Sequence, residues 1–249
     1  MNLFHEQNNF HNLNRKEPPH PLIQAAIRTI CERLKWFKQP FEKILILGPC
    51  RDLLKKESIS LKDASTQYAS TFEEYNCIIS FFDLQTVNDV PTYLSKIKTH
   101  LTPGGFFTAV FMGGESFLNL KNELMEVEIL HKSDVSLRVH PTIHIADGAA
   151  LMQHAGFACP MADIEHYMYK YESLYTLIKE LRLWAATSHF YETPKIIQKS
   201  CARYIIENKK TFEEKIDLIY LTGLKQPSGE KILETTKASI NILETPTRD

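Results

Sequence analysis

Short, unbroken apolar runs alternate with helical patterns in the first half of this chain. Three such runs occupy residues 43–48, 77–82 and 106–112, and none shows the polar alternation of a half-exposed strand. Strands of this kind are buried on both faces, as in parallel sheets that crossover helices cover on each side. The pattern therefore predicts an α/β fold with a doubly wound, mainly parallel sheet.

Helices are expected around these strands. The first starts at Pro21 and carries apolar residues at helical spacing, namely Ile23, Ile27, Ile30, Leu34 and Phe37. Another begins at Asn88-Asp89-Val90-Pro91, and residues 102–105 are expected to turn. The second half adds extra helices over residues 115–131, 145–154, 173–188 and 194–208, with strands over residues 163–169 and 211–222. One domain over residues 21–224 is predicted, between a polar N-terminal arm (1–20) and a polar C-terminal tail (225–249).

Composition excludes several classes of protein. Lys and Arg number 29 against 30 Asp and Glu, so the basic patch of a general nucleic-acid binder is missing and no nucleic-acid partner is expected. No apolar run approaches the roughly 20 residues that a membrane span requires. The five cysteines are odd in number and form no CxxC pair. A reducing, cytoplasmic location is therefore expected.

Glycine is scarce where nucleotide-binding loops need it. The chain has 9 glycines in 249 residues, and Gly48 is the only one among the first 103. That is about half of the roughly 7% that is typical. Complete Walker A and GxGxxG signatures are absent.

Several segments, in this order, resemble class I S-adenosylmethionine-dependent methyltransferases. They are similar in particular to the methyltransferase-like complex I assembly factors, relatives of the malonyl-carrier-protein methyltransferase of biotin synthesis. The segments that carry the resemblance are residues 45–48, 77–82, 84–91, 101–105, 106–115, 138–141, 155–157 and 174–188. The resemblance implies a Rossmann-like methyltransferase fold and S-adenosylmethionine as cofactor.

The first loop departs from that family. An acidic residue and three glycines usually stand there, as Asp-x-Gly-x-Gly-x-Gly, but here the four positions are Ile46, Gly48, Cys50 and Asp52. Only Gly48 remains of the glycines that let the cofactor lie against the backbone. The resemblance assigns cofactor contacts to six positions, and the departures predict weakened or lost binding there: Gly48, Cys50, Asp63, Ala64, Ser80 and Phe81.

Spacing supports this erosion. Residues 49–76 are 28 in number, about the length of one βαβ unit, so one strand-helix unit of the family is missing after the first strand. What remains is expected as a helix near residues 52–56 and a strand near residues 59–61. Asp63 is then the acidic end of the family's third strand, which contacts adenine, or it caps a simple turn. Cys50 is either a reactive thiol at a helix N-terminus or a small buried residue that fills the shortened loop.

The substrate or partner pocket is predicted from the second half. The resemblance places Gly113, Gly114, His140 and His144 beside it. Gly113-Gly114 instead forms a plain strand-to-helix turn in the alternative interpretation. His140 and His144 have the spacing of two metal ligands, but Pro141 and the lack of a third ligand favour no metal. Tyr167, Tyr169, Tyr171 and Tyr175 form an interaction surface, or the first three lie on one face of a strand and cover a helix.

Two functions follow. The first is a methyltransferase-fold protein that has weak or no cofactor binding and acts as an assembly factor, with a respiratory complex subunit or a carrier protein as partner. The alternative is an active methyltransferase on a protein or a carrier-bound small substrate, or the arginine-modifying activity ascribed to the complex I relatives. No catalytic residue can be named, because no triad is assembled by local signatures. The oligomeric state is left open.

Overall fold

The computed structural model describes residues 20–38, 40–48, 50–57, 61, 63–65, 73–131, 134–183, 197–209 and 211–227. Residues 1–19 of the predicted arm lie outside this part of the chain, as do Pro49, residues 58–60 of the expected strand and almost all of the tail. The end of the helix predicted to Ser188 and the start of the one predicted at Pro194 also lie outside it.

A five-stranded sheet in the order β1-β2-β3-β5-β4 forms the centre of the fold. Its strands are β1 (Ile44–Leu47), β2 (Tyr75–Phe81), β3 (Leu101–Gly113), β4 (Ala158–Tyr171) and β5 (Phe212–Leu224). The first three run parallel, whereas β5 lies antiparallel between β3 and β4. The predicted α/β class and the parallel order of the three apolar runs are confirmed.

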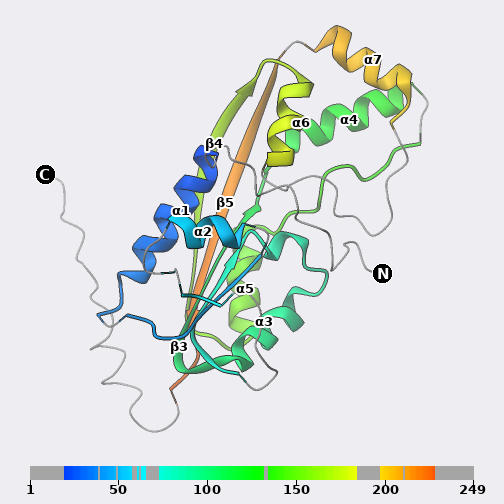
Figure 1. The fold of residues 1–249 in the computed structure, drawn as a ribbon. Coiled ribbons are helices and arrows are strands. Elements are labelled where there is room, and N and C mark those ends of the chain that lie inside the picture. The colour runs from blue at the N-terminus through cyan, green and yellow to red at the C-terminus, as the bar shows by residue number, and fades with distance from the viewer. Residues whose placement is uncertain are drawn as a thin grey trace, which may run out of the picture.

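Helices cover both faces of this sheet (Figure 1). On one face lie α1 (Pro21–Leu34) and α2 (Arg51–Glu57), and on the other lie α3 (Val90–Thr99) and α5 (Ile145–His154). Two hydrophobic cores result, one beneath α1 and α2 and the other beneath α3 and α5. This double covering explains why the parallel strands are apolar on both faces.

Local capping sets the helix starts as the sequence indicates. The His20 Nδ1 accepts a hydrogen bond from the Leu22 backbone N–H at 3.1 Å, and Pro21 begins α1. Asp89 caps α3 in the same way, since its Oδ1 accepts from the Thr92 N–H at 3.0 Å. At the end of α5, Gly156 takes the left-handed φ of +72°. The predicted bounds of α5 are confirmed at both ends.

The predicted turn at residues 102–105 is wrong in one respect. The structure includes these residues in β3, which begins at Leu101 beside Tyr75 of β2. The bend is still present, because Gly104 has a φ of +78° and a Cβ on Gly105 would lie 2.8 Å from the Thr102 carbonyl oxygen. The pairing with β2 skips these residues, since the register passes from Tyr75–Leu101 to Cys77–Phe106, so the predicted bend lies inside β3 as a bulge.

The extra helices of the second half gather beyond one end of the sheet (Figure 1). They are α4 (Leu118–Leu130), α6 (Leu174–Leu183) and α7 (Lys199–Asn208), which follow or precede the long strands β3, β4 and β5. Leu120 and Val127 form the buried face of α4, and Phe117 just before the helix is buried as well. These helices create the region where the candidate site lies.

The tyrosines of β4 point to one face of the strand. The rings of Tyr167 and Tyr169 lie 6.5 Å apart, and those of Tyr169 and Tyr171 lie 6.3 Å apart. Tyr169 also contacts the His20 ring at the start of α1, whereas Tyr175 is 75% exposed. The packing interpretation therefore holds for three of the four tyrosines, and Tyr175 is separate from them.

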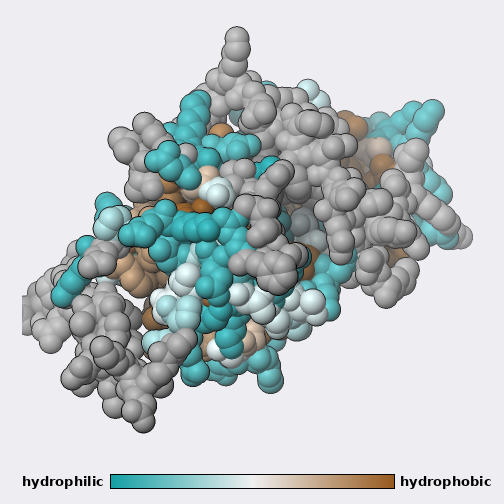
Figure 2. Space-filling view, turned by 60° about the horizontal axis from the view of Figure 1, so that its bottom comes forward, coloured by the Kyte–Doolittle hydropathy of each residue, from teal (hydrophilic) through white to brown (hydrophobic). Residues whose placement is uncertain are grey.

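Hydrophilic residues dominate the described surface in Figure 2, with hydrophobic ones showing in small areas between them. All five cysteines carry free thiols, and three of them are buried. Within the described ranges, no helix has the length and apolar character that crossing a bilayer requires.

Candidate functional site

The adjacent carboxyl ends of β1 and β2 bring together three predicted cofactor residues. Leu47 pairs with Ser80, so Gly48 lies beside Phe81. A Cβ on Gly48, whose φ is +107°, would lie 2.1 Å from the Phe81 carbonyl oxygen. Ligands of doubly wound sheets bind at this edge. Here, however, the space in which a Gly48 Cβ would stand is filled by the Phe81 carbonyl group, so that side of the glycine is closed to a ligand.

Cys50 follows at the start of α2 and is 1% exposed. Burial raises the pKa of its thiol to about 12. The thiolate that nucleophilic chemistry needs is therefore disfavoured at neutral pH. Of the two interpretations given for Cys50, the buried residue that fills the shortened loop is confirmed.

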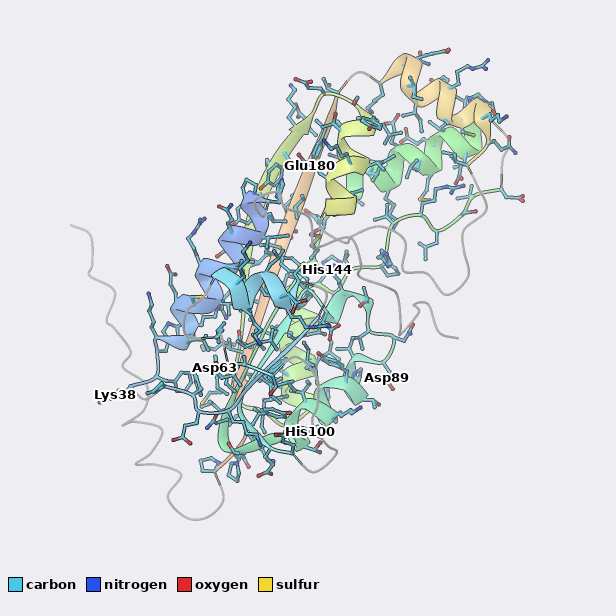
Figure 3. The ribbon with its side chains drawn as sticks, in the orientation of Figure 1. Lys38, Asp63, Asp89, His100, His144 and Glu180 are labelled. Atoms are coloured by element: carbon cyan, nitrogen blue, oxygen red, sulfur yellow. The ribbon has the colours of Figure 1, made fainter. Side chains whose placement is uncertain are left out.

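Asp63 and Ala64 do not join this edge. Ser65 forms a parallel bridge with Leu45, through the Ile46 N–H to the Ser65 oxygen and the Ser65 N–H to the Ile44 oxygen, both at 2.8 Å. Asp63 precedes Ser65 and therefore lies toward the amino end of β1, opposite Gly48. Its side chain is exposed, and Figure 3 shows it far from His144. This position does not support the predicted adenine contact and favours the turn interpretation.

The bridge also corrects which strand remains. In a doubly wound sheet of order 3-2-1-4-5-6, the strand beside the first is the second. Ser65 holds that position on the outer side of β1, so this remnant corresponds to a second strand and not to the third. Among the described residues, nothing else pairs with that side of β1. The strand-helix unit predicted to be missing from the 28-residue spacing would belong at this edge.

Asp83 is an acidic residue at the ligand edge that the sequence prediction omitted. Its Oδ2 accepts a hydrogen bond from the Tyr93 hydroxyl at 2.8 Å, and the same hydroxyl lies 3.1 Å from the Ser80 Oγ. Burial raises the pKa of Asp83, while the Tyr93 hydrogen bond and the Arg51 charge lower it. An acidic residue just after a buried strand was the signal that could have identified it.

A cavity of about 510 Å³ lies beside this edge. Its walls come from four parts of the chain: the 3-10 turn η2 (Leu84–Thr86) with the end of β3, α4, residues 138–142, and α6 with the α7 region. Most lining side chains are aliphatic, among them Leu120, Leu124, Leu174, Ile178 and Leu181. Apolar cavities of this size are typical of small-molecule sites.

Of the four predicted pocket residues, only His140 lines the cavity. Gly113 and Gly114 lie behind it and are needed for packing. A Cβ on Gly113 would lie 2.6 Å from the Ile143 oxygen, and one on Gly114 would lie 2.4 Å from the Asp217 Oδ2. His144 is exposed at the N-terminus of α5. The glycines thus support the turn interpretation, and His144 does not line this cavity.

One cavity wall holds a buried ion pair. The Arg138 Nε donates to the Glu128 Oε1 at 2.6 Å, and the Ser136 backbone N–H donates to the Glu128 Oε2 at 3.1 Å. Glu128 is fully buried, and Arg138 lines the cavity. Arg138 belongs to a segment that carries the family resemblance, but only the fold shows that its partner is a carboxylate ten residues earlier.

No group of three His, Cys, Asp or Glu side chains suited to a metal ion occurs in the described parts of the chain. His140 is partly buried in an irregular segment, and His144, four residues later, is exposed. The two therefore do not share a helix face as the paired-ligand interpretation requires.

Glu214 next to α4 predicts a pH-dependent stability. Burial raises the pKa of this carboxyl from 4.5 to about 7, and the Leu120 backbone and the Lys209 charge oppose that shift. Because the folded pKa is the higher one, the stabilisation is complete below pH 4.5 and is lost as the pH rises through 7. We expect this loss to be about 1–2 kcal/mol, since solvent screening reduces the effect.

Urea denaturation of the wild type and of Glu214→Gln between these pH values measures that loss. The difference in free energy of unfolding between the two should change across the window and level off above about pH 8. A difference that stays constant over the whole pH range would contradict a raised pKa of Glu214.

The sequence is related to methyltransferases and to complex I assembly factors. RP459 of Rickettsia prowazekii (strain Madrid E), named provisionally as a methyltransferase, is 31% identical over 152 residues, which cover 59% of this chain and 66% of that protein. The mitochondrial arginine-hydroxylase NDUFAF5 of Dictyostelium discoideum is 28% identical over 110 residues, 44% of this chain and 25% of that protein. The chain thus spans just under two thirds of one relative and a quarter of the other.

A solved structure supports the fold independently. The YcgJ protein from Bacillus subtilis superposes with a TM-score of 0.51 at 10% sequence identity, over 82% of this chain and 99% of that one. No protein-family profile matches the sequence.

The sheet order, the glycine after β1 and these comparisons define a methyltransferase fold, and the chain is similar in sequence and structure to class I S-adenosylmethionine-dependent methyltransferases. Its relatives include RP459 and NDUFAF5. The predicted resemblance to complex I assembly factors is therefore confirmed.

Proposed function

We propose that this chain is a methyltransferase-fold binding protein with weak or no affinity for S-adenosylmethionine, and that its apolar cavity holds part of its partner or substrate. The observation that carries the proposal is the lack of space beside Gly48. In this fold a glycine after the first strand gives the cofactor access to the backbone. Here the position of its missing Cβ is already filled by the Phe81 carbonyl oxygen, 2.1 Å away.

The outer edge of β1 supports the same proposal. Asp63 lies toward the amino end of β1, and the only described pairing on that side is the single bridge at Ser65. Loss of a charged hydrogen bond to the cofactor costs roughly 1.5–3 kcal/mol. About 3 kcal/mol corresponds to roughly a hundredfold in affinity. A micromolar site would thereby become hard to fill, and we derive no methyl-transfer step for it.

An active methyltransferase on a protein or carrier-bound substrate is the second candidate. Asp83, Tyr93 and Ser80 favour it, because they keep a hydrogen-bonded polar group at the ligand edge. Catalysis in such enzymes depends mainly on the placement of the reacting groups, so a missing catalytic side chain does not count against this candidate.

The partner is proposed from the relatives. NDUFAF5 is a mitochondrial arginine-hydroxylase by name, and its match to this chain supports a role in the assembly of a respiratory complex. A subunit of such a complex is therefore the proposed partner, with a carrier protein as the other possibility. The free thiols of the five cysteines support a reducing compartment such as the cytoplasm.

A thermal-shift titration with S-adenosylmethionine and S-adenosylhomocysteine tests the proposal. A micromolar site would gain about 4 kcal/mol at ~1 mM ligand. In a chain of this size that gain raises the Tm by roughly 8–16 °C. We expect a shift below about 2 °C for either ligand.

Two variants make the titration decisive. The proposal would be overturned if ligand raised the Tm of the wild type by about 10 °C and this increase were lost in Asp83→Asn but kept in Asp147→Asn. That result would show that the cofactor binds at the carboxyl ends of β1 and β2. Asp147 is a suitable control because it is an exposed carboxylate in the first turn of α5.

A further inference from the structure

The walls of the cavity beside β3 combine aliphatic side chains with polar groups that are already hydrogen-bonded. We propose that this cavity binds an uncharged hydrocarbon chain. The inference rests on the proposed role of the cavity as a binding site and names the chemical class of its ligand. It does not depend on whether the cofactor binds.

Three polar side chains of the lining are hydrogen-bonded to the backbone. The Thr142 Oγ1 donates to the Gly114 carbonyl oxygen at 2.5 Å, and the Ser116 Oγ donates to the Gly113 carbonyl oxygen at 2.6 Å. The Gln85 Oε1 accepts from the Met112 backbone N–H at 2.8 Å. Because these three side chains already form hydrogen bonds with the backbone, the walls offer a ligand mainly apolar surface.

The charges near the cavity disfavour a cationic ligand. No Asp or Glu occurs among the described lining residues. Glu128, the carboxylate partner of the lining residue Arg138, is fully buried and accepts hydrogen bonds from Arg138 and Ser136. A guanidinium or ammonium group inside the cavity would therefore lose its hydration without gaining a counter-ion, which is strongly unfavourable.

An anionic ligand would also gain little electrostatic attraction in this cavity. Arg138 is the cationic wall residue, and both its Nε and its Nη2 lie within 2.6 Å of the Glu128 Oε1. The pair is neutral as a whole, so the attraction that a free arginine would give to a carboxylate or phosphate is largely cancelled. A neutral hydrocarbon chain avoids both costs and gains from the aliphatic lining.

Three ligands that share one chain length test this inference: 1-octanol, octanoate and octylguanidinium. Their affinities for the full chain can be measured by isothermal titration calorimetry at one salt concentration. We expect 1-octanol to bind best and octylguanidinium to bind at least about tenfold more weakly. Binding of octylguanidinium or octanoate as tight as that of 1-octanol, or no binding of 1-octanol, would overturn the inference.

Paired variants on α4 locate the binding. Leu124 lines the cavity, whereas its neighbour Met125 is 37% exposed. Leu124→Glu places a carboxylate in the lining and should reverse the preference toward octylguanidinium, while Met125→Glu should leave the order unchanged. An unchanged order in a folded Leu124→Glu would show that the ligands bind elsewhere and would overturn the inference.

A second variant covers the case in which Leu124→Glu does not fold. Ala202 also lines the cavity, and Ala202→Phe fills part of its volume. We expect 1-octanol to bind at least about tenfold more weakly to this variant, and unchanged binding would contradict the inference. These titrations contain no cofactor, so they are independent of the thermal-shift experiment. If 1-octanol binds and S-adenosylmethionine also raises the Tm strongly, only the proposed function is refuted. Flat titrations in both experiments would refute only this inference.

Discussion

Gly48→Ala is expected to lower the free energy of unfolding by about 3 kcal/mol or more. The new Cβ would lie 2.1 Å from the Phe81 carbonyl oxygen, a backbone atom that cannot move away as a flexible side chain can. Overpacking of this kind costs roughly 1–3 kcal/mol. A residue with a side chain at a φ of +107° adds roughly 1–2 kcal/mol of backbone strain. Urea denaturation of the two proteins gives the difference directly.

Gly104→Ala is the matched control for this substitution. Gly104 also has a positive φ, +78°, but a Cβ there meets nothing within 4 Å. Only the backbone strain applies, so the expected loss is about 1–2 kcal/mol. Equal losses in the two variants would show that the contact between the ends of β1 and β2 is less tight than described.

Arg138→Leu is expected to lower the free energy of unfolding by about 3–5 kcal/mol, the range for removal of one partner from a buried ion pair. The Glu128 carboxylate is fully buried and would keep only the Ser136 backbone N–H among the partners described for it. Its charge would then be poorly compensated in a low-dielectric wall. Chemical denaturation at neutral pH measures the loss.

Two further proteins separate the ion pair from simple loss of packing. The double variant Glu128→Leu/Arg138→Leu removes both charges and should recover most of the stability, because an apolar pair in a buried site is often as stable as the ion pair. Lys170→Met breaks the exposed pair with Glu213 and should cost less than about 1 kcal/mol. A double variant as unstable as Arg138→Leu would mean that packing dominates.

Much of the architecture could be predicted because its causes are local. The apolar spacing after Pro21, the Asp89 cap and Gly156 depend on neighbours within a few residues, and all three helix boundaries that they indicate are correct. The order of the three parallel strands also follows from short apolar runs separated by one crossover.

The candidate site was harder to predict because register and long-range contacts decide it. Asp63 lies at the wrong end of β1 since the bridge forms at Ser65, and no pattern in residues 58–65 fixes that register. His140 and His144 are four residues apart, yet one lines the cavity and the other is exposed at the start of α5. The Glu128 partner of Arg138 is likewise visible only once α4 is packed.

The position of β5 has a consequence for how the chain is made. β4 is completed 40 residues before β5 begins, yet β5 is the strand that joins β4 to the rest of the sheet. During synthesis the 14-residue β4 therefore emerges with both edges unpaired, a state prone to association with other chains. Closure of the sheet therefore waits for one late strand.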